Sequence, residues 1–144
     1  MYKKSLFLCV ISLFFLSCGD INTLSKLELV SAKTGFTDYR ATIFYPKISI
    51  KVKNISDEDL TSSILVKALF IDKINNEQLG SDSYLIKGPF KSKMNKTVTL
   101  KSQEGITYLG RNLIKFLDDS NIVCEIYINE QFYKEIKIEA KAFM

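Results

Sequence analysis

Three cysteines carry the most evident chemistry in this 144-residue chain, and each lies in a different setting. Cys9 lies inside an apolar run, Cys18 follows that run, and Cys124 lies in a segment of alternating apolar residues. A thiol can be acylated, oxidised, bound to a metal or used as a nucleophile. The chain has no histidine, so a conventional Ser-His-Asp or Cys-His site is excluded and the commonest transition-metal ligand is missing.

The setting of Cys18 is that of a processing site. Lys3 and Lys4 precede an apolar run from Leu6 to Leu16, and the small residue Ser17 stands directly before the cysteine. A basic start, roughly ten apolar residues and a small residue at the cut predict a secretory signal that is too short to span a bilayer. An ordinary signal peptide cut near Ser17, which would leave Cys18 as a chance thiol, is the alternative.

The same residues resemble the lipobox of bacterial lipoproteins. The resemblance implies that residues 1–17 are removed and that Cys18 becomes a lipidated N-terminus, followed by a short tether over residues 18–23. Two or three acyl chains hold a protein firmly, whereas one chain binds a membrane only marginally. Gly19 at the next position favours the outer membrane by analogy with lipoprotein sorting. From Gly19 to Thr23 the chain reaches at most roughly 17 Å, so any partner is expected near the membrane.

The remaining residues show no pattern of a catalytic or metal site. No serine is followed three positions later by lysine, and the six glycines never form a G-x-G loop. Asp57, Glu58 and Asp59 are a candidate calcium site, but consecutive carboxylates lack the alternate spacing of an EF-hand loop and are more typical of an acidic hairpin tip. We therefore expect a protein that is not an enzyme and binds no cofactor or metal.

The net charge and the number of cysteines exclude a class of partner and a kind of crosslink. The formal net charge of +4 falls by two when Lys3 and Lys4 leave with the signal, which argues against a nucleic-acid partner. Cys124 would then be the only free thiol of the mature domain, so an intramolecular disulfide is excluded. Because it alternates with Glu125 in an apolar segment, we expect it to be a buried small hydrophobe.

Alternation with a period of two predicts an all-β domain over residues 24–144. The pattern is cleanest from Phe44 to Asn54, while Ser63 to Asp72 is apolar on both faces and is predicted to be a central strand. About seven strands separated by turn signals predict an antiparallel β-sandwich. The spacing of apolar residues from Ile106 to Leu117 predicts one short helix that crosses between the sheets. The predicted strands are Leu24–Ala32, Phe44–Asn54, Ser63–Asp72, Leu79–Lys87, Met94–Lys101, Ile122–Asn129 and Phe132–Ala140.

The middle of the chain resembles the FxLyD-type family of bacterial Ig-like domains. The resemblance covers roughly Phe44 to Leu100, with a strand that ends at Asn54, a strand that ends at Asp72, a restart at Gln78-Leu79-Gly80 and the Gly88-Pro89 turn. It implies an Ig-like sandwich in an envelope-attached accessory domain, and it supplies no catalytic residues.

Aromatic and arginine side chains are the remaining candidates for a functional surface, because tyrosine and arginine are favoured anchors in protein interfaces. We predict a membrane-anchored envelope lipoprotein that acts as a protein-interaction or accessory module. A glycan or small-ligand binder and an envelope inhibitor or immunity lipoprotein are the alternatives. The candidate interaction residues are Tyr39, Arg40, Tyr45, Tyr84, Tyr108, Arg111 and Tyr133.

Overall fold

The computed structural model describes residues 23–39, 42–108 and 112–140. The predicted signal, Cys18, Arg40 and Arg111 lie outside the described residues, and so does the side chain of Tyr39. None of the described helices is both long enough and apolar enough to cross a membrane.

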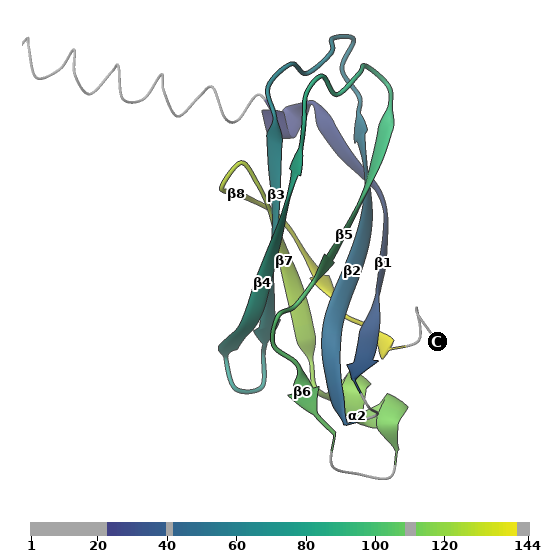
Figure 1. Ribbon diagram of the computed structural model, residues 1–144, viewed down its shortest axis with the longest axis vertical. Coiled ribbons are helices and arrows are strands. Elements are labelled where there is room, and N and C mark those ends of the chain that lie inside the picture. Colours follow the sequence, from purple (N-terminus) through teal and green to yellow (C-terminus); the bar gives the residue numbers. More distant parts are fainter. Residues whose placement is uncertain (1–22, 40–41, 109–111, 141–144) are drawn as a thin grey trace, which may run out of the picture.

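The described residues form two packed antiparallel sheets, so the chain is an all-β, Ig-like sandwich (Figure 1). One sheet has the order β1-β2-β5, with β6 paired to β2 beyond the end of β5. The other has the order β4-β3-β7-β8. The strands are β1 (Leu27–Tyr39), β2 (Ile43–Asn54), β3 (Ile64–Asp72), β4 (Glu77–Ile86), β5 (Asn95–Lys101), β6 (Ile106–Thr107), β7 (Ile122–Ile128) and β8 (Gln131–Lys137), and the helix is α2 (Leu113–Asp119).

Alternating side chains of both sheets meet in one core. In β2, Ile48, Ile50 and Val52 are fully buried, and the residues between them point to the outer face of the sheet. In β3, Val66 and Phe70 are fully buried in the same way. Strand β3 lies between β4 and β7, so the prediction of a central strand is confirmed. The strands of both sheets lie within residues 27–137, and Leu24 of the preceding turn packs against their core.

The first predicted strand was wrong at both ends. Residues 23–25 form a helical turn, so β1 begins at Leu27. It continues to Tyr39 because every residue except Val30 pairs with a partner on β2, up to Ile43. A register shift lies between Leu29 and Ser31 and interrupts the alternation. The residues after this bulge are mostly polar, so the sequence did not indicate the second half of the strand. This half is extended because it pairs with β2.

The predicted helix is correct only in its second half. Residues Ile106–Thr107 form β6, and α2 begins after Asn112, whose side-chain oxygen accepts a hydrogen bond from the backbone N–H of Lys115 at 3.1 Å. The helix connects the β1-β2-β5 sheet to β7 of the other sheet, as predicted. Ile106 and Phe116 both pack against a small second cluster around Phe44 and Leu117. Their helical spacing therefore reflects two elements that cover one cluster, and not one continuous helix.

Candidate interaction surface

Asn54 organises the loops at the end of the sandwich where residue 23 lies (Figure 1). Its side chain is completely buried. The amide nitrogen donates to the carbonyl oxygens of Glu58 at 2.8 Å and Phe90 at 2.9 Å. The amide oxygen accepts from the backbone N–H of Ser56 at 3.0 Å and from its hydroxyl at 2.6 Å. One asparagine thus joins the β2–β3 loop to the β4–β5 loop.

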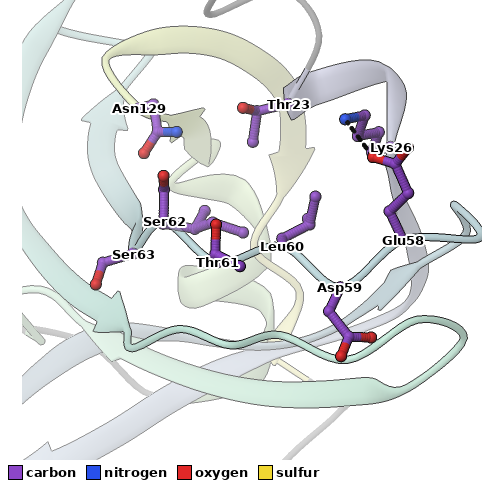
Figure 2. A pocket seen from close by; sticks show the side chains of 10 residues that line it. Thr23, Lys26, Glu58, Asp59, Leu60, Thr61, Ser62, Ser63 and Asn129 are labelled. Carbon is purple, nitrogen blue, oxygen red and sulfur yellow. Dashed lines mark ion pairs between the residues drawn. The ribbon is translucent and has the colours of Figure 1, made fainter.

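A cavity of about 330 Å³ lies beside these loops (Figure 2). Thr61, Ser62 and Ser63 line one side, and Thr23 and Asn129 come from the N-terminal turn and from the β7–β8 connection. Lys26 and Glu58 form an ion pair of 3.7 Å at its rim. Hydroxyl and amide groups dominate the lining, so this site can hydrogen-bond a small polar molecule, but it offers no nucleophile with an adjacent base.

The three consecutive acidic residues have three different partners. Asp57 lies 3.3 Å from the Lys93 ammonium, and Glu58 pairs with Lys26. Asp59 accepts a hydrogen bond of 2.8 Å from the backbone N–H of Ser92. Within residues 23–39, 42–108 and 112–140, no group of three or more acidic or cysteine side chains is arranged to hold a metal ion. The carboxylates therefore contact neighbouring loop residues from exposed positions, where ion pairs contribute little to stability.

The predicted interaction residues do not gather on one surface. Tyr45 lies on the outer face of the β1-β2-β5 sheet, where the Lys101 ammonium lies 4.8 Å from the centre of its ring. Tyr84 is 42% exposed on the edge strand β4, and Tyr133 is half-buried against the main core. Tyr39 ends β1 at the far end of the sandwich from residue 23, next to Ile43 (Figure 1).

Tyr108 is part of an aromatic cluster at that far end. Its ring makes edge contacts with Phe44, at 6.2 Å between centroids, and with Phe116, at 5.3 Å. Edge-to-face geometry at these distances is the favourable arrangement for aromatic pairs. The ring therefore joins β2 to α2, which is a structural role that the sequence alone did not indicate.

The structure adds an apolar surface that sequence reasoning missed. Leu65 and Leu69 of β3 point to the outer face of the β4-β3-β7-β8 sheet, and Leu85 of β4 pairs directly with Leu65. On the same face, Tyr127 of β7 makes an edge contact of 5.8 Å with Phe132 of β8. Leu85 is 48% exposed and Phe132 is 55% exposed. Lys67 lies on the same face between the two leucines of β3 and opposite Tyr127, and Glu125 lies opposite Leu69. We call the five apolar residues the apolar face. The sequence did show that β3 carries apolar residues on both sides, but that pattern was interpreted only as a sign of a central strand.

Two titratable groups on β7 differ in accessibility. Cys124 is completely buried in the core, as predicted, and burial together with the neighbouring Glu125 carboxylate raises the pKa of its thiol well above the ordinary range. The Tyr127 hydroxyl donates a 2.7 Å hydrogen bond to the Glu125 carboxylate, which raises the pKa of the phenol. The thiol is therefore neutral and inert, and the phenol is fixed in orientation on the apolar face.

Solved structures with a similar fold are parts of larger glycoside hydrolases. A glycosyl hydrolase family 2 member from Bacteroides cellulosilyticus DSM 14838 shares 15% identity at a TM-score of 0.49, over 78% of this chain and 14% of that one. A β-glucuronidase from glycoside hydrolase family 2 shares 11% identity at a TM-score of 0.46, over 75% of this chain and 11% of that one. A putative β-galactosidase from Bacteroides fragilis shares 9% identity at a TM-score of 0.43, over 74% of this chain and 15% of that one. No protein-family model and no curated protein matches the chain.

Proposed function

We propose that this chain is a membrane-anchored envelope lipoprotein whose Ig-like domain is a protein-interaction or accessory module without catalysis of its own. The anchor would be the lipid on Cys18, and the outer membrane is the favoured location because Gly19 follows the cysteine. The partner would be another envelope protein near the same membrane. Membership of the FxLyD-type family would be consistent with this role and stays a prediction.

The apolar face is the observation that carries this proposal. Leucine and aromatic side chains from β3, β4, β7 and β8 share one outer sheet face, on which Lys67 lies between the two leucines of β3. Exposed apolar side chains grouped on one surface and bordered by polar residues mark interaction sites, and aromatic residues are enriched in the cores of interfaces. The hydrogen bond from Tyr127 to Glu125 holds one aromatic ring in place before binding, which lowers the entropy lost on association.

Crosslinking in the native cell, followed by affinity purification of the lipidated full chain, tests whether the domain binds an envelope protein through the apolar face. The face variant is Leu85→Lys with Phe132→Lys, which places two charges where a partner would exclude water. The matched control is Ile74→Lys with Met94→Lys, because these residues are 65% and 56% exposed and lie outside the apolar face. We expect one stoichiometric partner with the wild type and the control, and its loss with the face variant at an unchanged unfolding temperature. Equal capture by both variants would contradict the proposal.

The anchor has its own test. Cys18→Ala removes the sulfur to which the lipid would be attached, so the variant should leave the membrane fraction or remain unprocessed. If it fractionates with membranes like the wild type, the anchor is refuted while the interaction surface is not.

The cavity beside Thr61–Ser63 is the observation that favours the second candidate, a small-ligand or glycan binder. Thermal unfolding of the domain against a panel of sugars and peptidoglycan fragments distinguishes the two functions. A shift that increases with ligand concentration supports ligand binding, because a ligand stabilises only the state that it binds.

A further inference from the structure

Hydroxyl groups without a partner in the protein surround the cavity of Figure 2. They belong to Thr23, Thr61, Ser62 and Ser63, which all line it. Among residues 23–39, 42–108 and 112–140, no hydrogen bond occupies these hydroxyls. Other hydroxyls at the same end of the sandwich are used internally, because Ser56 donates to Asn54 at 2.6 Å and Ser92 donates to the carbonyl oxygen of Ser56 at 2.6 Å. The hydroxyls of the cavity are therefore free to bind a ligand.

The walls of the cavity are fixed before a ligand binds. Asn129 and Glu130 have φ angles of 47° and 68°, which a two-residue hairpin turn requires. The side-chain oxygen of Asn129 accepts from the N–H of Leu65, and its backbone N–H donates to the carbonyl of Leu65, each at 2.9 Å. On another wall, Leu60 and Phe90 exchange backbone hydrogen bonds of 2.9 and 2.8 Å. A site held in this way loses little entropy on binding.

One positive and one negative side chain lie together at the rim. The Lys26 ammonium is 3.7 Å from the Glu58 carboxylate, and the side chains are 36% and 78% exposed. Exposed ion pairs contribute little to stability, so a ligand that carries both charges can replace this pairing. The Asp59 carboxylate accepts from the N–H of Ser92 at 2.8 Å and points away from the other lining side chains (Figure 2). The rim therefore complements a zwitterion better than a ligand with a single charge.

The remaining lining selects the anionic half of that zwitterion. Hydroxyls, the Asn129 amide nitrogen and the Lys26 ammonium can all donate hydrogen bonds, and phosphate offers more acceptor oxygens than a carboxylate. We propose that the cavity binds an ethanolamine phosphate group, with the phosphate on Lys26 and the hydroxyls of residues 61–63 and the ammonium on Glu58. A volume of about 330 Å³ lies at the small end of the range for ligand sites, which suits such a group. This inference specifies the ligand of the second candidate function.

The position of the cavity favours a lipid headgroup as the source of this group. Thr23 lines the cavity, and the five residue steps that separate it from Cys18 reach at most about 17 Å. With the proposed lipid on Cys18, the cavity stays close to the headgroups of the same leaflet. This step rests on the proposed lipid anchor, whereas the chemistry of the cavity does not.

Isothermal titration calorimetry of the full chain in a nonionic detergent tests the ligand. The probes are glycerophosphoethanolamine, glycerol phosphate, ethanolamine and glycine. The site variant is Lys26→Gln, and the matched control is Lys73→Gln. Both lysine side chains are 36% exposed and form one ion pair with a glutamate, at 3.7 and 3.5 Å, but Lys73 lies outside the cavity. A second site variant, Glu58→Gln, removes the negative charge that would bind the ammonium.

We expect saturable binding of glycerophosphoethanolamine and about tenfold weaker binding of the other three probes. Lys26→Gln should weaken binding about tenfold, because it removes a charge-assisted hydrogen bond, while Lys73→Gln stays within about twofold of the wild type. Glu58→Gln should bind glycerophosphoethanolamine and glycerol phosphate equally. The absence of saturable binding, tighter binding of glycine, or equal losses in the two lysine variants would overturn the proposal.

Mixed micelles of the same detergent test the source of the group. Micelles that contain phosphatidylethanolamine should displace glycerophosphoethanolamine from the wild type, and micelles that contain phosphatidylglycerol should not. If neither lipid competes while the soluble probe still binds, the leaflet is overturned as the source and a soluble ester takes its place. Neither assay uses the apolar face or requires the lipid on Cys18, so a failure here is distinct from a failure of the interaction module or of the anchor.

Discussion

Replacing Asn54 by alanine should strongly destabilise the domain, although it removes only a small polar side chain. The side chain is 0% exposed and makes four hydrogen bonds, two donated and two accepted. Alanine would remove all four bonds: the carbonyl oxygens of Glu58 and Phe90 would keep only their second donors, the Ser56 hydroxyl and the Leu60 N–H, and the Ser56 N–H would lose the amide oxygen that accepts from it. A typical hydrogen bond contributes about 1 kcal/mol, and each buried group left unpaired adds about 1–3 kcal/mol. Since water can reach part of the loop, we expect a loss of about 3–4 kcal/mol.

Urea unfolding of residues 19–144, followed by circular dichroism, measures this loss. For a domain of this size it corresponds to a fall of roughly 10–16 °C in unfolding temperature. Asn95→Ala is the matched control, because Asn95 is exposed at the start of β5, and it should change the unfolding free energy by less than about 0.5 kcal/mol.

Asn54→Asp separates hydrogen bonding from packing. Aspartate keeps the shape and the acceptor oxygen, but it points a second oxygen at the carbonyls of Glu58 and Phe90. We therefore expect it to be at least as destabilising as alanine at pH 7. A loss below about 1 kcal/mol in Asn54→Ala, or a milder effect in Asn54→Asp, would refute the view that this amide joins the two loops.

Three further predictions concern the core and one close approach. Cys124 should not react with thiol reagents in the native protein. Because the fold raises the pKa of this thiol, the thiol ionises in the unfolded state before it does in the folded state, from about pH 9 upward. The unfolding free energy should therefore fall with pH by up to ~1.4 kcal/mol per unit relative to Cys124→Ala. The same pH dependence above pH 9 in both proteins would contradict this. Phe70→Ala should lower the unfolding free energy by about 3–5 kcal/mol in urea, whereas the control Thr97→Ala, at an exposed position of β5, should lower it by less than ~0.5 kcal/mol. Gly88→Ala should lower the unfolding temperature measurably, because the added Cβ would collide with the carbonyl oxygen of Thr61. An unchanged melting curve would show that the segments around Gly88 and Thr61 can move apart without cost.

The strands that alternate cleanly could be predicted from the sequence. Strand β2 was predicted within one residue, because Ile48, Ile50 and Val52 are all buried on one side and lysines lie on the other. Local periodicity suffices where one face meets the core and the other meets solvent. It failed for β1, where a bulge breaks the period, and for β6, which is two residues long and exists only because it pairs with Ile43 and Phe44.

The candidate surfaces were less predictable for the same physical reason. A sequence shows which residues of one strand share a face, and it showed the lysine row of β2. It does not show which strands lie next to each other, so it could not place Lys33 and Lys101 beside that row, nor Phe132 beside Tyr127.

The sequence by itself therefore determined the all-β class, the buried face of each regular strand and the inert setting of Cys124, because these follow from short-range alternation. It also carries the Cys18 pattern on which the proposed anchor rests. Only the tertiary structure decided that Asn54 joins two loops, that Tyr108 and Tyr133 pack inward, and which residues of different strands share an outer sheet face. Strand order and register set these contacts, and they depend on pairing between residues that are far apart in the chain.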